Sequence, residues 1–217
     1  MLQHIVPHHY LKGFCDPQPS KRQGPVVWEF RLKGDGVVRQ RSPKNVGRIR
    51  DYYSVPIDGV MDPAIEGGLS TIESGAAPVI AKLRGGNFTV GEEERQWLAA
   101  FIALQMVRGP AHRDHVQAFI AMVGTNWLRA MGRRPEALGQ LLREVPGIKD
   151  EDRTPARVQE LARMAAEPEK HFKITATPHS SLPAMTVLPD LMPPILTLRW
   201  EILVAGAREH FVTRTTR

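Results

Sequence analysis

Cysteine is almost absent from this sequence, and long apolar runs are missing altogether. The 217 residues include one cysteine, Cys15, which excludes an internal disulfide and a zinc site built from several cysteines. No apolar run approaches the roughly 18–20 residues that a membrane span needs. The N-terminus is polar within its first four residues, so it lacks the apolar segment of a secretory signal. We therefore expect a cytoplasmic protein with no membrane partner.

Positive charge is concentrated in the first quarter of the chain. Residues 1–55 contain 10 lysines and arginines against 4 acidic residues, whereas residues 56–217 contain 19 of each. The formal net charge of +6 therefore arises entirely from residues 1–55. A localised basic surface attracts phosphate groups, although an ordinary solvated face has the same composition. Nucleic acid is therefore an expected partner, and the sequence leaves the oligomeric state open.

Residues 26–41, VVWEFRLKGDGVVRQR, have the pattern of a β-hairpin. Two runs rich in β-branched and aromatic residues flank a glycine-containing turn. Alternation along the first strand places Trp28 and Phe30 on one face. Basic side chains gather on the opposite face and form a predicted nucleic-acid-binding surface, which consists of Arg31, Lys33, Arg39 and Arg41.

Helical periodicity dominates the middle of the chain. The first helix is predicted to begin at Asp62-Pro63, an N-cap residue followed by a proline at the first helical position, and to bend or end at Pro78. Thr89 and Glu92 are predicted to form the capping box of a second helix. Three more helices are predicted over residues 111–131, 135–144 and 155–167, and a looser one over 180–196.

The remaining segments complete a mainly helical α+β fold. The stretches LTLRWEILVAG and HFVTR are predicted to form two C-terminal strands. We expect a single domain over residues 1–217, in which an N-terminal β-hairpin and a C-terminal strand pair pack on a helical core. Its parts are a basic strand and hairpin segment (1–55), the helical core (61–195) and the terminal strands (196–214).

Two predicted helices carry polar residues on otherwise apolar faces. Helical spacing extends one apolar face into Gln105 and Arg108, and it places Glu66 and Glu73 on a partly apolar face of the other helix. A buried charge is costly unless it is paired, so Arg108 is expected to pair with Glu73 or Glu66. Such a pair either fixes the register of the two helices and does no chemistry, or forms part of a site.

The functional interpretation combines these residues with an N-terminal histidine. Buried carboxylates beside Gln105 and Arg108 can hold a phosphate or a divalent metal such as Mg²⁺ or Mn²⁺. Glu66 and Glu73 are seven residues apart, about 10 Å along a helix axis, so at most one of them would be a metal ligand. The predicted ligands are His4 and Glu73.

The opening stretch QHIVPHHYLKGF, residues 3–14, contains the pattern His-x-x-Pro-x-x-Tyr-Leu-x-x-Phe from His4 to Phe14. This pattern resembles the signature that opens a bacterial family, domain of unknown function 4238. The later segments VVWEF, NVGRIRDYYSV and LRWEILVAGAREHFVT are similar to elements of that family and follow in the same order. Gln105, Arg108 and Pro110 match its Gln-x-x-Arg-x-Pro element. The resemblance implies one fold over nearly the whole chain, but no established reaction.

The C-terminus departs from the family pattern. Members typically continue after Phe-x-Thr into Ser-Asp-Asn-Pro and further strands, whereas this sequence ends with FVTRTTR. The resemblance therefore implies a truncated member, without any activity that needs the missing Asp or Asn.

Two functions follow as hypotheses. In the first, the chain acts on nucleic acid as a metal-dependent nuclease or a defence-type effector, with the hairpin binding phosphates. His4 would be a metal ligand or general base, Glu73 a metal ligand, and Gln105 and Arg108 would stabilise a phosphoryl group. In the second, the chain is a non-catalytic binding or regulatory module whose polar cluster is structural. Metal-dependent cleavage would support the first hypothesis, and salt-dependent binding without turnover the second.

Overall fold

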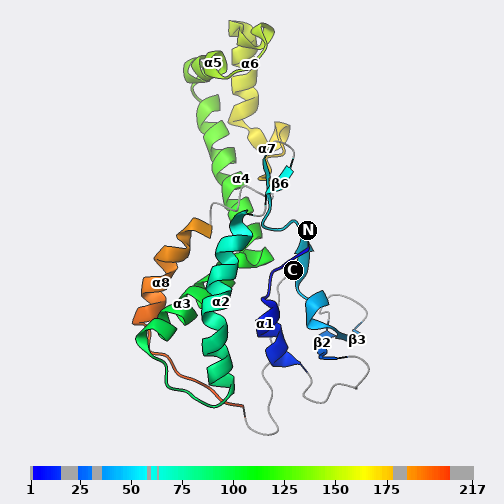
Figure 1. Cartoon of the computed structure of the whole chain (residues 1–217). Coiled ribbons are helices and arrows are strands. Elements are labelled where there is room, and N and C mark those ends of the chain that lie inside the picture. Colours follow the sequence, from blue (N-terminus) through cyan, green and yellow to red (C-terminus); the bar gives the residue numbers. More distant parts are fainter. Residues whose placement is uncertain are drawn as a thin grey trace. The chain divides into compact units, whose positions relative to one another are not determined.

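The computed structural model describes residues 2–15, 24–30, 36–57, 60–62, 64–177 and 185–205. The chain forms two compact units, unit 1 (residues 1–113 and 182–217) and unit 2 (residues 114–181). The fold is α+β and mainly helical, as predicted, with its described strands in short antiparallel pairs (Figure 1). The single domain expected over residues 1–217 stays a prediction, and each unit is described by itself.

Unit 1 contains the strand pairs. The predicted hairpin is confirmed: β2 (Val27–Phe30) pairs with β3 (Val38–Arg41), so that Trp28 faces Gln40 and Glu29 faces Arg39. The opening stretch, residues 2–14, is not one continuous strand: a short strand is followed by two short helical segments. The other elements before the first long helix are β1 (Leu2–His4), α1 (His8–Leu11), η1 (Lys12–Phe14), η2 (Pro43–Asn45), β4 (Arg48–Arg50), which pairs with β1, and the pair β5 (Val55–Ile57) and β6 (Val60–Asp62).

Three helices form the frame of unit 1. They are α2 (Ala64–Arg84), α3 (Glu92–Arg108) and α8 (Leu188–Thr197), and α3 packs against both of the others (Figure 1). No helix within the described residues has both the length and the apolar character that a membrane span requires. The core combines the N-terminal segment with the helices, and its buried members are Ile5, Val6, Leu11, Tyr52, Tyr53, Leu69 and Leu104.

The structure differs from three expected helix signals. Asp62 is the last residue of β6 rather than a helix N-cap, and α2 does not end at Pro78 but continues to Arg84, with Ala76 and Val79 buried near the proline. The N-cap of α3 is Gly91, not Thr89. Its backbone N–H donates to Glu94 Oε2 at 2.9 Å, which replaces the predicted capping box.

The first predicted C-terminal strand is not formed in the described residues. α8 extends to Thr197, and residues 198–205 have no regular secondary structure, while the expected partner strand, residues 210–214, lies outside the described residues. Arg95 of α3 instead donates to the carbonyls of Leu196 (3.0 Å) and Leu198 (2.6 Å) and stacks 4.4 Å from the ring of Trp200. These contacts satisfy backbone oxygens that a strand would have paired.

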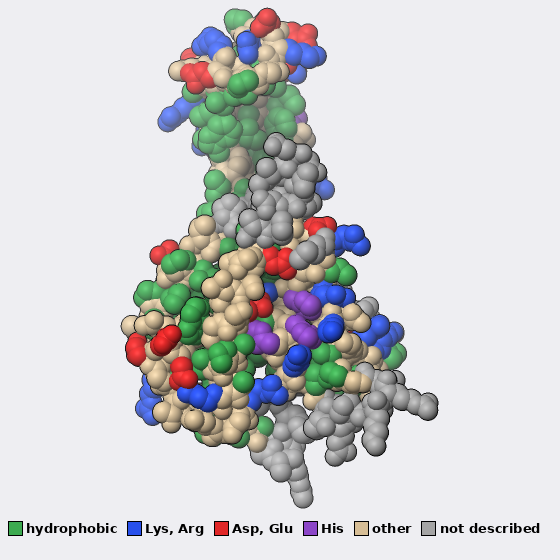
Figure 2. Space-filling view, viewed as in Figure 1, with side chains coloured by type: hydrophobic (Ala, Val, Ile, Leu, Met, Phe, Trp, Pro, Cys, Tyr) green, Lys and Arg blue, Asp and Glu red, His purple; other side chains and the backbone are tan. Residues whose placement is uncertain are grey.

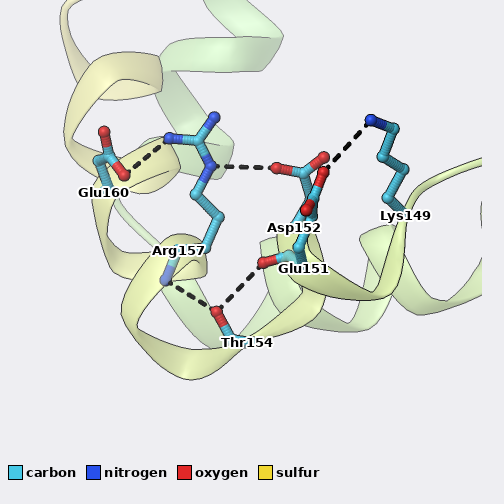
Figure 3. Close-up of polar contacts among 6 residues, drawn as sticks. All are labelled: Lys149, Glu151, Asp152, Thr154, Arg157 and Glu160. Atoms are coloured by element: carbon cyan, nitrogen blue, oxygen red, sulfur yellow. Dashed lines mark hydrogen bonds and ion pairs between the residues drawn. The ribbon is translucent and has the colours of Figure 1, made fainter.

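Unit 2 is helical throughout its regular structure. It contains most of α4 (Pro110–Gly132), together with α5 (Pro135–Glu144), η3 (Asp150–Arg153), α6 (Pro155–Ala166) and α7 (Pro168–His171). The Arg157 guanidinium binds Asp152 (3.1 Å) and Glu160 (2.7 Å), and its backbone N–H donates to the N-cap Thr154 (3.4 Å), as Figure 3 shows. The helix predicted over residues 155–167 is therefore confirmed, with Thr154 as its N-cap. Exposed ion pairs of this kind stabilise a fold only slightly, so their main effect is to fix the turn that precedes α6.

Gly132, at the end of α4, is predicted to be intolerant of a side chain. A Cβ at this position would collide with the backbone of Ala165 and Ala166 and with the Ala162 carbonyl, none of which can move aside easily. Although Gly-to-Ala usually stabilises a helix, we expect Gly132→Ala to lower the free energy of unfolding by about 1–3 kcal/mol. Urea denaturation followed by circular dichroism measures the change.

Gly68 provides the matched control, because a Cβ there meets nothing within 4 Å and the residue lies inside α2. Gly68→Ala should stabilise the protein by about 0.5–1 kcal/mol. A Gly132→Ala variant that is as stable as Gly68→Ala would show that α4 and α6 do not approach as closely as described.

Candidate functional site

Arg108, the last residue of α3, is the centre of a buried polar network. Only 3% of the residue is exposed. Its guanidinium donates from Nη1 to Glu73 Oε1 (2.7 Å), from Nη2 to the His4 carbonyl (2.6 Å) and from Nε to the Tyr53 hydroxyl (3.2 Å). Tyr53 in turn donates its hydroxyl proton to the Arg108 carbonyl at 3.2 Å. Arg108 therefore connects α2, β1 and the segment after β4 to the end of α3.

The expected pairing of Arg108 with a glutamate of the preceding helix is confirmed for Glu73. Glu66, the other candidate, accepts instead from Gln3 Nε2 at 3.1 Å. Gln3 also donates to Ser54 Oγ at 3.1 Å, and its Oε1 accepts from the Tyr53 N–H at 2.6 Å. Gln3 is thus a second, fully buried link between β1 and the segment after β4.

Three histidines lie beside this network and are referred to as the histidine cluster: His4, His8 and His9. The rings of His4 and His8 are 5.9 Å apart, and the ring of His9 is 5.8 Å from that of Phe101 on α3. His4 joins the Arg108 network through its backbone carbonyl, which leaves its imidazole available. The predicted site residue His4 is therefore brought to Arg108 and Glu73.

Three buried side-chain nitrogen atoms near Arg108 have no hydrogen-bond partner among the described residues. They are His4 Nε2, His9 Nε2 and Gln105 Nε2. Gln105 lies one turn before Arg108 on α3 and one turn after Phe101, the residue that His9 contacts. Because buried polar atoms in proteins are almost always paired, these three atoms distinguish the cluster from an ordinary core.

Burial lowers the pKa of each of the three histidines. The nearby cation Arg48 lowers the pKa of His4 further, and Lys12 and Lys44 do the same for His8. Burial is also the main cause at His9, where the Glu73 carboxylate opposes it and the Arg108 guanidinium adds to it. At neutral pH the imidazoles are therefore neutral, because water is partly excluded and the surrounding charge is mostly positive.

Basic side chains surround the histidines at the surface. Figure 2 shows histidine side chains gathered on one face, with lysine and arginine beside and below them. Lys12 and Lys44 are exposed and form no ion pair in the described part of the chain, and Arg48 binds the neutral Asn45 side chain at 2.9 Å. This arrangement can attract an anion to neutral imidazoles that are able to donate to it.

The predicted metal ligands, His4 and Glu73, lie near each other but are not part of a larger group of ligands among the described residues. Among the residues that the structure describes, no group of three or more His, Cys, Asp or Glu side chains is placed to hold a metal ion. Glu73 is already engaged by Arg108 at 2.7 Å. His4 and Glu73 as metal ligands therefore stay a prediction, in which Glu73 would bind a metal beside its pair with Arg108.

The predicted nucleic-acid-binding surface lies partly outside the described residues, which do not include Arg31 and Lys33. Arg39 and Arg41 lie on the Glu29 face of the hairpin, opposite to Trp28, as the alternation predicted. Arg41 forms an ion pair with Glu29 at 3.7 Å. Gln3, Tyr53 and His9 were missed as parts of the cluster. The Gln3-His4 order and the Tyr52-Tyr53 pair within family-like segments were the signals that pointed to them.

A family model described as "Protein of unknown function (DUF4238)" matches residues 2–214. The match spans the histidine motif at residues 3–14, the segment with Tyr53, and the Gln105–Arg108 element. No curated protein and no solved structure matches the chain.

Removing the Arg108 guanidinium should strongly destabilise unit 1. Arg108→Met keeps an apolar stem but leaves Glu73, the Tyr53 hydroxyl and the His4 carbonyl without their donor. Breaking a buried pair on one side costs about 3–5 kcal/mol, so we expect a loss of that size in urea denaturation.

Lys149→Met is the control, because it removes the cation of an exposed pair with Glu151 (3.3 Å). Its effect should stay within about 0.5 kcal/mol. If Arg108→Met and Lys149→Met lowered the free energy of unfolding by similar amounts, the Arg108 network would not be a main source of the stability of unit 1.

The histidine cluster should make stability depend on pH. The pKa values of His4 and His9 are lowered in the folded protein, so the unfolded chain binds protons first as the pH falls. The stabilisation is present above the unfolded pKa of about 6.5 and is lost as the pH falls through it toward the folded values. We expect the urea midpoint to fall between about pH 7.5 and about pH 5, and to fall less in His9→Gln. His115→Gln, an exposed histidine of α4, should change as the wild type does, and an unaltered pH dependence in His9→Gln would refute the explanation.

Proposed function

The chain belongs to this family of proteins of unknown function, and we propose that it acts on nucleic acid by binding a backbone phosphate at the histidine cluster. One observation carries the proposal: His4 Nε2, His9 Nε2 and Gln105 Nε2 are buried beside Arg108 without a hydrogen-bond partner among the described residues. Imidazole and amide nitrogens can each donate to an oxygen, and a phosphate presents several acceptor oxygens at once.

The charge around the cluster supports an anionic ligand. Lys12, Lys44 and Arg48 contribute positive charge next to the imidazoles, while the nearby carboxylate of Glu73 is neutralised by Arg108. The first 55 residues carry the whole formal excess of positive charge, so the same part of the chain also extends the basic surface to the hairpin. A polyanion whose phosphates repeat along its length fits this distribution better than a single small anion.

The imidazoles also supply a plausible chemistry for a nuclease. A histidine whose pKa is lowered is neutral at neutral pH, with one ring nitrogen that donates and one that accepts. His4 can therefore take a proton on its unprotonated nitrogen from a water that attacks the bound phosphodiester, while the P–O bond to the leaving oxygen breaks and that oxygen takes a proton from solvent. Gln105 would hold a non-bridging oxygen, and Arg108 would keep the histidines in position. The proposed step is written with the side chains alone, and Mg²⁺ and Mn²⁺ are varied as conditions of the assay.

A specific observation also favours a second candidate, a binding module without catalysis. The guanidinium of Arg108 is buried and makes three hydrogen bonds within the protein, so it is held as a structural element rather than presented to a substrate. In this alternative the Glu73–Arg108 pair fixes the helices, and the histidine cluster only binds phosphate. Turnover separates the two candidates.

Loss of a cluster histidine should weaken nucleic-acid binding. In fluorescence anisotropy with labelled DNA and RNA at several salt concentrations, the wild-type affinity should fall linearly with log salt, as counterion release requires. His9→Ala should weaken binding about tenfold, since it removes one hydrogen bond to a charged group. His115→Ala, the control, should bind as the wild type does. Equal affinities of His9→Ala and wild type would contradict the phosphate site.

The same proteins, incubated with plasmid DNA, single-stranded DNA and total RNA, distinguish catalysis from binding. Each substrate is incubated with Mg²⁺, Mn²⁺ or EDTA, and His4→Ala is included after its fold has been checked by circular dichroism. Cleavage that is lost in a folded His4→Ala variant supports the nuclease, and salt-dependent binding without cleavage supports the binding module. A dependence of cleavage on metal would overturn the metal-free step.

A further inference from the structure

The β2–β3 hairpin directs its aromatic residues outward. Trp28 is 57% exposed and Phe30 is 55% exposed, whereas Val27, which precedes Trp28 and lies on the other face of the strand, is only 5% exposed. Strands usually turn their large aromatic side chains toward the core and their polar ones toward water. In β2 the aromatic side chains are exposed while Val27 on the other face is buried. The hairpin therefore packs against the protein through one face and exposes its aromatic face.

The register of the hairpin defines this outer face. Trp28 lies opposite Gln40 and Phe30 lies opposite Val38, and all four side chains are exposed. Trp28 and Phe30 are two residues apart on one strand, about 6.6 Å along its axis. Two rings at this spacing can each receive one base of an extended single strand, whose neighbouring bases are no longer stacked on each other.

Basic residues continue from the hairpin to the histidine cluster. Arg39 and Arg41 lie on the other face of β3, and η2 begins two residues after Arg41. Lys44 of η2 acts electrostatically on His8, and η2 packs on α1, the helix that carries His8 and His9. The chain thus connects the aromatic face to the proposed phosphate site through a short basic segment.

We propose that the outer face of the hairpin, Trp28, Phe30, Val38 and Gln40, is a stacking platform for the bases of a single-stranded nucleic acid. This inference rests on the proposed function, because the phosphates of the same strand would extend over the basic segment toward the histidine cluster. The positive charge of this part of the chain favours a polyanion over an apolar protein surface as the occupant. In a regular duplex the bases are stacked on one another, so a duplex offers no base to Trp28 or Phe30.

The test compares three fluorescently labelled probes of equal length: single-stranded oligo(dT), a DNA duplex, and an abasic deoxyribose-phosphate strand. The abasic strand has the phosphates of oligo(dT) but nothing to stack. Trp28→Ala should weaken binding of oligo(dT) about tenfold and leave the other two affinities unchanged. Trp28→Phe keeps an aromatic ring and should restore most of the lost affinity.

Trp127→Ala is the matched control, because Trp127 is an exposed tryptophan on α4 in unit 2. It should bind all three probes as the wild type does. Equal losses for Trp28→Ala on all three probes, or no loss on any of them, would overturn the stacking platform while leaving the phosphate site intact. A wild-type protein that binds none of the probes would overturn the proposed function and this inference together. If Trp28→Ala leaves every affinity unchanged but reduces self-association, the face belongs to an interface between copies of the chain.

Discussion

The desolvated guanidinium of Arg108 is the constraint on which unit 1 depends. A cation that is 3% exposed is stable only if its donors are matched by fixed acceptors, and here the acceptors come from three segments far apart in the sequence: Glu73 on α2, the His4 carbonyl at the end of β1, and the Tyr53 hydroxyl. The N-terminal segment is therefore held in place by the end of α3. Gln3 adds a neutral counterpart, since its amide binds Glu66, Ser54 and the Tyr53 backbone at the same junction.

This junction determines the state of the histidines. Because Arg108 fixes the His4 carbonyl, the imidazole of His4 is held at the rim of the buried network, where partial loss of water and nearby cations keep it neutral. Two of the nearby cations, Lys12 and Lys44, are exposed, and the carboxylate of Glu73 is bound by Arg108. The charge beside the histidines is therefore mostly positive, which favours the approach of an anion.

The sequence predicted those features that depend on local periodicity. A pair between Arg108 and Glu73 or Glu66 followed from 3.6-residue spacing and the cost of an unpaired buried charge, and the two faces of the hairpin followed from alternation around a glycine-containing turn. Features set by distant contacts were missed or wrong. Gln3 and Tyr53 look unremarkable until the fold brings them to Arg108. Residues 198–205 have the composition of a strand, but Arg95 binds the carbonyls of Leu196 and Leu198 at their start. The candidate site was predictable in its charged members and not in its neutral ones, because a charge must find a partner whereas an amide or a phenol can be buried in many ways.

A structural role of the Arg108–Glu73 pair is compatible with phosphate binding at the histidine cluster, because the two roles use different atoms. Arg108 and Glu73 use their charged groups on each other, and His4 contributes only its backbone carbonyl to that pair. The atoms that remain unpaired in the described residues, the Nε2 atoms of His4, His9 and Gln105, take no part in that pair. A buried ion pair is a costly way to stabilise a fold, since apolar residues of the same volume often serve as well or better. Here the pair also fixes a segment in place, because the bond from Arg108 Nη2 to the His4 carbonyl (2.6 Å) holds the end of β1, the strand that carries His4. In the proposed function, the exposed lysines attract the phosphate and the buried nitrogens hydrogen-bond to it. Salt strongly screens the attraction by the lysines but not the hydrogen bonds.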